Sequence, residues 1–254
     1  MSRSRRKRGT PVYLELGAPV WFPDPREYDA DGLVAVGGDL STPRLLGAYA
    51  AGIFPWYEQG ILPMWWSPDP RGVLTPASLH VSRSLRRRAR QRDFTLTWNQ
   101  CFQRVMAECG RQRAHGSWVI PEMIAAYERL HRLGQAHSLE VWLDGELVGG
   151  LYGVQVGALF AAESMFHRAT DMSKIALAAA VPTLFTCGIE LFDVQFVTAH
   201  LASLGAFTLT RADYLQRLTV ITRKQVLLQP QVLLAAWPPP SPEPPADSPA
   251  GPTA

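Results

Sequence analysis

The chain has 254 residues, enough for one full hydrophobic core or for a large and a small core that share an interface. With 47% hydrophobic and 19% charged residues, its composition is that of a folded protein and excludes a disordered chain. The formal net charge is +3, but five positive charges precede residue 9 and the remainder sums to −2, so affinity for nucleic acid would have to come from local patches.

The termini predict two segments outside the folded core. Residues 1–10 form a basic arm without hydrophobic periodicity, and it has neither the apolar core nor the cleavage site of a secretory signal. Residues 229–254 are rich in Pro, Ser and Ala, a composition that predicts a tail that does not pack.

A small N-terminal domain is predicted over residues 11–70. The stretch "STPRLLGAYAAG" (residues 41–52) indicates a short helix, because a Ser/Thr cap and an early Pro precede the apolar residues and a Gly ends them. The following "FPWYEQGILPMWWSPDPRGVL" places aromatic residues between prolines and predicts rigid loops and short strands.

A larger domain, residues 71–228, is predicted to begin with three helices and to continue as a sheet. The helices start at Ser82, at about Asn99 and at Pro121, the last one ending at Leu133. The stretch "SLEVWLDGELVGGLYGVQVGALFAAESMF" then alternates apolar and polar residues around turn residues, as antiparallel strands do.

A further helix, Ser173 to Gly188, leads directly into an apolar strand, "IELFDVQF" (residues 189–196). Antiparallel strands followed by a helix and another strand predict a mixed, mostly antiparallel sheet with helices packed on it. The expected fold class is α+β.

A carboxylate lies in an apolar strand in "ALFAAESMF". Strict alternation would put Glu163 on the same face as Leu159, Ala161 and Met165. Asp193 and Gln195 are two residues apart on the later strand and should also share a face. Burial of a carboxylate costs on the order of several kcal/mol unless the group is paired with a cation or hydrogen-bonded. Two alternatives follow: a satisfied hydrogen-bond network inside the sheet, or the polar wall of a ligand pocket.

Four arginines of the helix after Ser82 follow the spacing i, i+3, i+4 and i+7, which places them in one basic stripe: Arg83, Arg86, Arg87 and Arg90. Such a stripe suits a phosphate backbone. The alternative is a solvated helix face in an arginine-rich chain.

The cysteines, histidines and longest apolar run exclude several site and compartment classes. The three cysteines lack CxxC spacing and the six histidines show no ligand-like spacing, so we expect reduced thiols and no bound metal. The longest apolar run, residues 175–185, contains a proline and is far short of the ~20 residues of a membrane span. We expect a cytoplasmic protein without membrane contact, and take a monomer as the default.

Several stretches together resemble the leucyl/phenylalanyl-tRNA–protein transferase family, in order from about residue 20 to Tyr214. They are "GLVAVGGDLSTPRLLGAYAAGIFPW", "WWSPDPRGVL", "HGSWVIPEMIAAYERLHRLGQAHSLEVW", "GELVGGLYGV", "LFAAESMF" and "FDVQFVTAHLASLGA". The resemblance implies a small N-terminal domain packed on a domain similar to GNAT acyltransferases. It also implies transfer of Leu or Phe from aminoacyl-tRNA to proteins with N-terminal Arg or Lys, which marks them for degradation, without an added cofactor.

The resemblance assigns roles to the polar residues. It makes Asp193 and Gln195 the catalytic pair, with Asp193 polarising Gln195 and Gln195 orienting the attacking amine. Glu163 would position the aminoacyl end or attract the cationic acceptor. Trp56 and Trp118 match positions that stack on the terminal adenosine, and the hydroxyl of Tyr127 would add a contact.

The donor's side chain would be selected by size and apolarity. Such a pocket separates residues that differ by one methylene by only ~1–3 kcal/mol, so Leu, Phe and Met are all expected to fit. Ordinary core packing is the alternative for each of its candidate residues, which are Leu151, Phe160, Met165, Leu177 and Ala180.

The remaining motifs agree with an aminoacyl ester as donor. The ester is already activated, and the chain has no GxxxxGK[ST] loop for ATP. The strand-to-helix junction "HRATDMSKIAL" lacks the glycine that would let its backbone approach the pyrophosphate of coenzyme A. Two alternatives are a Fem-like transferase that builds cell-wall peptides and an RNA-binding module without catalysis. The polar trio of Glu163, Asp193 and Gln195 argues against the second.

Overall fold

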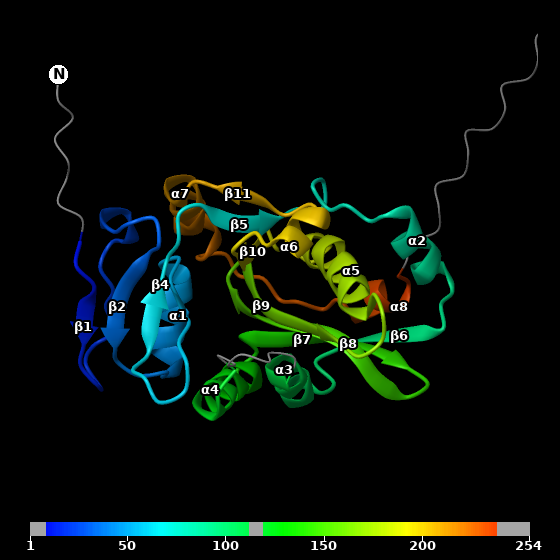
Figure 1. Cartoon of the computed structure of the whole chain (residues 1–254), viewed down its shortest axis with the longest axis horizontal. Coiled ribbons are helices and arrows are strands. Elements are labelled where there is room, and N and C mark those ends of the chain that lie inside the picture. Colours follow the sequence, from blue (N-terminus) through cyan, green and yellow to red (C-terminus); the bar gives the residue numbers. More distant parts are fainter. Residues whose placement is uncertain (1–8, 112–118, 238–254) are drawn as a thin grey trace, which may run out of the picture.

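A computed structural model describes residues 9–111 and 119–237 of the protein (Figure 1). The strands are β1 (Val12–Leu14), β2 (Leu33–Gly37), β3 (Phe54–Pro55), β4 (Met64–Trp66), β5 (Arg71–Leu74), β6 (Phe94–Trp98), β7 (Ala136–Leu143), β8 (Glu146–Val156), β9 (Leu159–His167), β10 (Leu191–Gln195) and β11 (Phe207–Leu209). The helices are η1 (Pro25–Glu27), α1 (Thr42–Ala50), α2 (Arg83–Arg90), α3 (Phe102–Arg111), α4 (Pro121–Arg132), α5 (Met172–Thr186), α6 (Ala199–Ser203), α7 (Arg211–Ile221) and α8 (Gln231–Ala235). The predicted α+β class is confirmed.

The N-terminal part forms a four-stranded sheet in the order β1-β2-β4-β3. Its helix, α1, has Pro at its first turn and buries Leu45, Ala48 and Tyr49. The indole of Trp65 is fully buried, lies 5.0 Å from the ring of Phe22, and donates a hydrogen bond of 2.8 Å from its Nε1 to the carbonyl of Gly37. We propose that this sheet and the larger one correspond to the two predicted domains.

The larger sheet has seven strands in the order β11-β5-β10-β9-β8-β7-β6. Only β9 and β10 are parallel, and α5 connects them, as a parallel crossover requires. The other pairs are antiparallel, including β7 and β8 around the predicted turn, where Asp144 and Gly145 both have positive φ. The predicted mixed, mostly antiparallel sheet is confirmed.

The two faces of the large sheet are covered by different helices (Figure 1). Helix α5 is apolar on almost every side and packs on one face, while α3 and α4 pack on the other. The core under α3 and α4 also contains residues of α1 and of the small sheet, so it is continuous with the core of the N-terminal part. No helix in the described ranges combines the length and apolarity needed to cross a membrane.

Strand β6 was not predicted. The second helix was expected from about Asn99, but Asn99 has φ of +61° and the helix α3 starts at Phe102. The residues just before it alternate apolar and polar side chains and pair with β7 as an edge strand. The prediction missed this strand because the segment lies between two strongly helical stretches.

The prediction that residues 229–254 do not pack was wrong for residues 229–237. Helix α8 lies against β6 and α5, with Leu234 only 1% exposed. The ring of Trp237 lies 6.4 Å from that of Phe94. The proline-rich composition of the whole segment concealed a short apolar turn at its start. Residues 238–254 lie outside the described part of the chain, as do residues 1–8 of the basic arm.

This correction can be tested with a pair of substitutions on one helix. Leu234→Ala should lower the free energy of unfolding by about 2–5 kcal/mol, because it leaves a cavity under α8. Val232→Ala is the matched control: Val232 is 80% exposed on the same helix, so the change should stay within about 0.5 kcal/mol. Urea denaturation of the full chain measures both. Equal, small effects would contradict the packing of α8.

Candidate active site

The site forms where β9 and β10 separate. These strands pair in register only from Leu191 with Leu159 to Asp193 with Ala161. Each strand has a bulge directly beyond that point. On β9 the pairing with β8 skips Glu163, and on β10 the pairing with β5 skips Val194. Because a bulge bends its strand, the two strands diverge beyond Asp193 and leave an opening in the middle of the sheet.

The bulge corrects the predicted alternation of β9. Ala162 and Met165 both contribute to the core on the α5 face, although strict alternation would separate them. Ala161 and Phe166 both belong to the core on the α3 and α4 face. Glu163 is the additional residue at which the alternation reverses, so its neighbours follow a different pattern from the one expected.

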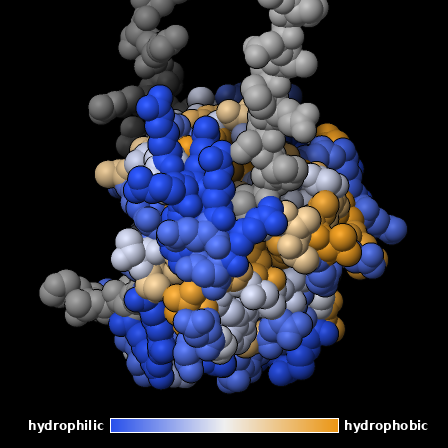
Figure 2. All heavy atoms as spheres, turned by 90° about the vertical axis from the view of Figure 1, so that its right-hand side faces the viewer, coloured by the Kyte–Doolittle hydropathy of each residue, from blue (hydrophilic) through white to orange (hydrophobic). Residues whose placement is uncertain are grey.

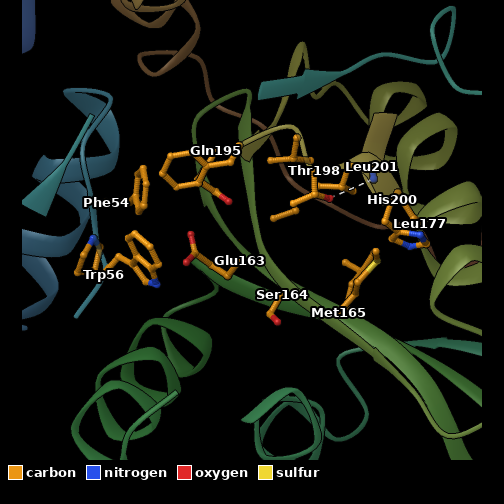
Figure 3. Close-up of a pocket in the computed structure, with 15 residues that line it drawn as sticks. Phe54, Trp56, Glu163, Ser164, Met165, Leu177, Gln195, Thr198, His200 and Leu201 are labelled. Atoms are coloured by element: carbon orange, nitrogen blue, oxygen red, sulfur yellow. Dashed lines mark hydrogen bonds between the residues drawn. The ribbon is translucent and has the colours of Figure 1, made fainter. Parts of the chain in front are cut away.

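The opening holds a cavity of about 350 Å³. In Figure 3, Glu163 and Gln195 point toward each other across it, from the two diverging strands. Phe54 and Trp56 lie at the end nearer the small sheet, and the residues from α5 and α6 form the other end. The lining residues are Phe54, Pro55, Trp56, Leu151, Ala162, Glu163, Ser164, Met165, Leu177, Val194, Gln195, Phe196, Thr198, His200 and Leu201.

Asp193 precedes the lining residues Val194 and Gln195 and forms a buried ion pair. Arg71 donates from Nε to Oδ1 over 2.9 Å and from Nη2 to Oδ2 over 2.6 Å. The hydroxyl of Tyr214 donates to Oδ2 over 2.9 Å, and the backbone N–H of Gln195 donates to Oδ1 over 2.9 Å. Both charged side chains are at most 1% exposed. The carboxylate therefore holds the backbone of Gln195, which differs from the predicted polarisation of the Gln195 side chain.

Gln195 occupies an unusual backbone conformation. Its φ is +57°, and the N–H of Phe196 donates to the carbonyl of Val194 over 2.6 Å, which closes a three-residue turn around Gln195. Such a turn is rare and strained for a residue with a side chain. The amide is 7% exposed and lines the cavity, and its Nε2 is buried without a hydrogen-bond partner among the described residues. A ligand acceptor in the cavity would satisfy this donor.

Glu163 is held from the opposite side by two tyrosines. The hydroxyl of Tyr49 donates to Oε1 over 2.8 Å, and it also forms a short hydrogen bond with the hydroxyl of Tyr127. Burial is the main reason why the pKa of Glu163 rises to about 8, and the charge of Asp193 adds to the effect. The hydrogen bond from Tyr49 and the charge of Arg71 oppose this rise. The free protein therefore holds Glu163 largely protonated at neutral pH.

The predicted aminoacyl pocket is partly formed. Leu151, Met165 and Leu177 line the cavity. Phe160 and Ala180 do not, and both are fully buried. Phe160 packs on Phe192 with ring centroids 5.3 Å apart, at a level where β9 and β10 are still paired. Neither residue therefore lines the cavity as expected, and for Phe160 the reason is that the cavity begins only above that level.

The predicted adenosine contacts have three different outcomes. Trp56 is 44% exposed at the cavity end and offers a ring surface. Trp118 lies outside the described residues. Tyr127 is fully buried and its hydroxyl is engaged with Tyr49, which contradicts the predicted contact with the adenosine.

Phe196 was missed, although it is adjacent to Gln195. It is 41% exposed, and its ring lies 5.8 Å from Trp56 and 5.9 Å from Phe54. The turn that presents Gln195 therefore also sets the aromatic wall beside Trp56.

The arginines of α2 lie on a separate surface. The hydroxyl of Ser82 caps the helix by accepting from the backbone N–H of Leu85 over 3.2 Å, as predicted. Helix α2 buries Leu85 and Ala89, while all four arginines of the predicted stripe are exposed. Figure 2 shows a hydrophilic area on the side of the molecule that carries α2. The arrangement agrees with either alternative for the stripe.

The cavity has the features of an acyl-transfer site. An apolar wall can hold a hydrophobic side chain, an unpartnered amide N–H can donate to a carbonyl oxygen, and a carboxyl group lies opposite. Among the described residues, no group of three or more Cys, His, Asp or Glu side chains could hold a metal ion.

Comparison with known families identifies the class of enzyme. The model of the leucyl/phenylalanyl-tRNA protein transferase matches residues 73–219, and the model of its N-terminal domain matches residues 38–69. The protein is therefore a transferase that moves an aminoacyl group. It belongs to the leucyl/phenylalanyl-tRNA–protein transferase family.

Three relatives with this family name align with the chain along most of their own length. The leucyl/phenylalanyl-tRNA–protein transferase of Edwardsiella ictaluri (strain 93-146) is 51% identical over 78% of this chain and 82% of its own. Those of Syntrophobacter fumaroxidans and Anaeromyxobacter dehalogenans (strain 2CP-C) are 52% and 48% identical, over 81% and 86% of this chain and 88% and 95% of theirs. A solved GCN5-related N-acetyltransferase from Kribbella flavida aligns with a TM-score of 0.38 and 12% identity, over 68% of this chain and 63% of that chain. An alignment this loose establishes neither fold nor function.

The raised pKa of Glu163 predicts a pH dependence of stability. Between its ordinary value of 4.5 and about 8, the folded state keeps a proton that the unfolded state has released. The stabilisation from Glu163 is therefore complete below about pH 4.5 and is lost as the pH rises to about 8. Glu163→Gln should remove this loss, so its stability relative to the parent should increase from about pH 5 to about pH 8.

Urea denaturation at several pH values measures the effect. Glu146→Gln, an exposed position at the start of β8, is the matched control and should keep the parental pH dependence. If Glu163→Gln and the parent lost stability in parallel, the carboxyl group would have an ordinary pKa.

Proposed function

We propose that the protein transfers Leu or Phe from aminoacyl-tRNA to the α-amine of proteins that begin with Arg or Lys, with Met as a further donor residue. The single observation that supports this best is the cavity between β9 and β10, where Gln195, whose Nε2 has no partner among the described residues, and Glu163 point toward each other beside an apolar wall. The resemblance to the family implies that the protein that receives Leu or Phe would be marked for degradation. We expect this reaction to take place in the cytoplasm.

The donor would enter with its aminoacyl side chain against Leu151, Met165 and Leu177. Its terminal adenosine would stack on Trp56, and a base stacked on an aromatic ring contributes about 1–3 kcal/mol. The carbonyl oxygen of the ester would then accept from Nε2 of Gln195. That donor would stabilise the oxyanion that develops during attack, and loss of one such donor typically lowers kcat by about 10²–10³-fold.

Asp193 would act as a positioning residue and would not touch the substrate. It does not line the cavity, and its oxygens are engaged by Arg71, Tyr214 and the backbone of Gln195. Its contribution would be to keep Gln195 in the strained turn that points the amide at the ester. Glu163 would face the incoming amine from the other side.

A transfer assay tests this function. The full chain is mixed with labelled leucyl-tRNA and peptides that begin with Arg, Lys or Ala, without ATP or coenzyme A. Transfer is expected to the first two peptides only, and Gln195→Ala should keep tRNA binding while it loses transfer by about 10²–10³-fold. Activity that requires acetyl-coenzyme A would contradict the proposal. Loss of tRNA binding in Gln195→Ala would contradict the role given to this residue.

Helix α2 would contact the tRNA backbone. Arg83, Arg86, Arg87 and Arg90 are exposed along it. Arg88, which does not follow the spacing of the stripe, is paired with Asp93, and its guanidinium lies 5.6 Å from the ring centroid of Phe94. Because the four arginines of the stripe are exposed while α2 packs through Leu85 and Ala89, they would bind phosphates without a change in the fold of the helix.

The contribution of the stripe can be measured through salt. In the double variant Arg86→Gln/Arg87→Gln, the slope of log K against log salt concentration for tRNA binding should fall by about 0.7–0.9 for each phosphate contact that is lost. The matched control is Arg217→Gln/Arg223→Gln, which changes two exposed arginines near α7 and should leave the slope unchanged. An unchanged slope in the α2 variant would remove the stripe from the tRNA-binding surface.

A further inference from the structure

Aminolysis of an ester needs a group that takes a proton from the attacking nitrogen, and the cavity offers few candidates. The amide of Gln195 is a very weak base. Asp193 does not line the cavity, and its carboxylate accepts four hydrogen bonds from protein donors. His200 lies at the α6 end beside Leu201, away from Gln195 (Figure 3). Among the described lining residues, this leaves Glu163.

The carboxyl group of Glu163 is well placed for this step. It points into the cavity toward Gln195, so a carbonyl carbon held by the Gln195 amide would lie between the two side chains (Figure 3). Its Oε1 is fixed by the hydroxyl of Tyr49 over 2.8 Å. An amine that approaches the ester from the side opposite Gln195 would therefore pass the carboxyl group.

The groups packed around Glu163 come from four elements, and some of them lower its pKa while others raise it. The hydrogen bond from Tyr49 on α1, the hydroxyl of Tyr127 on α4 and the positive charge of Arg71 on β5 all lower its pKa. Burial and the charge of Asp193 from β10 raise it and prevail, so that the pKa is about 8. A free α-amine has a pKa of about 7.7–8.0, so the proton can pass between the two groups in either direction at little cost.

We propose that Glu163 is the proton shuttle of the transfer reaction, an inference that rests on the proposed function. The amine nitrogen of the acceptor attacks the ester carbonyl carbon and forms the new C–N bond, while the carboxylate of Glu163 takes one proton from that nitrogen. The bond from carbon to the ribose oxygen then breaks, and Glu163 returns the same proton to the ribose oxygen. The carboxylate is restored, and no oxidant, reductant or further reactant is needed.

The two other roles considered for Glu163 make different predictions. A carboxylate that only attracts a cationic acceptor would change KM for the acceptor and leave kcat intact once the acceptor is saturating. A carboxyl group that only positions the donor would change KM for leucyl-tRNA, and Glu163→Gln, which keeps an oxygen for hydrogen bonding, would leave kcat near the parental value. A proton shuttle must affect both kcat and the pH profile.

The closing experiment is steady-state transfer from leucyl-tRNA to a peptide that begins with Arg, with the parent, Glu163→Gln and the exposed matched control Glu146→Gln. Glu163→Gln keeps the shape of the side chain and an oxygen for Tyr49. Its kcat at saturating acceptor should fall by roughly 10²–10⁴-fold, the usual contribution of a positioned base. Its KM for leucyl-tRNA should stay within about twofold, and Glu146→Gln should match the parent.

The pH profile and a rescue experiment provide independent readouts. For the parent, log(kcat/KM) for the acceptor peptide should rise with pH below about pH 7 with a slope that approaches 2, because both Glu163 and the amine must lose a proton. In Glu163→Gln only the amine must lose a proton, so the slope should be close to 1. In Glu163→Gly, added formate, acetate or cacodylate should restore transfer in the order of increasing basicity.

The outcomes distinguish failure of the proposed function from failure of the role proposed for Glu163. A parent that transfers nothing to the Arg peptide would overturn the proposed function and this inference together. A parent that transfers, with Glu163→Gln reaching the parental kcat at saturating acceptor, would overturn the inference alone. The same conclusion would follow if Glu163→Gly were rescued equally by all three anions or by none.

Discussion

The buried ion pair between Arg71 and Asp193 is the interaction on which the site depends. A buried charge is tolerated only when its hydrogen-bonding groups are satisfied, and removal of one partner from such a pair typically costs about 3–5 kcal/mol. Here the guanidinium also donates to the carbonyl of Gly52 over 3.1 Å and lies between the rings of Phe54 and Tyr214, at 4.7 and 4.6 Å. The pair thus joins the N-terminal part, the first strand of the large sheet and α7 at the point where the sheet opens.

The opening itself arises from two bulges in neighbouring strands. A continuous sheet would bury Glu163 and Gln195 among paired backbones and leave no space for a ligand. With one additional residue in β9 and another in β10, the strands stay paired up to Asp193 and separate beyond it. The paired part gives the site a rigid base, and the separated part supplies backbone positions from which polar side chains reach a cavity.

The sequence predicted most of the fold and pointed to the polar residues that line or adjoin the cavity, because both leave local signals. Turn residues mark the hairpin, caps and glycines mark the helices, and a carboxylate in an apolar strand is conspicuous. Local patterns do not reveal how strands are aligned. The bulge at Glu163 has no signature in "FAAESMF", so the alternation rule gave the wrong neighbours, and Phe160 was assigned to a pocket that begins above it. Arg71 is 122 positions from its partner Asp193, and only the tertiary structure brings them together.

The two carboxylates of the site differ in their surroundings, and this separates their roles. Asp193 is enclosed by donors and faces Arg71, so it serves as a fixed anchor for the turn at Gln195. Glu163 lies on the neighbouring strand β9, where it accepts a hydrogen bond from the hydroxyl of Tyr49 in an apolar neighbourhood. Burial there raises its pKa to about 8, so it can gain and lose a proton near neutral pH. Burial is the main cause of the raised pKa of Glu163, and the two members of the ion pair modify it in opposite directions: the charge of Asp193 raises it and that of Arg71 lowers it. The backbone of Gln195 and the pKa of Glu163 are therefore linked through the same buried ion pair.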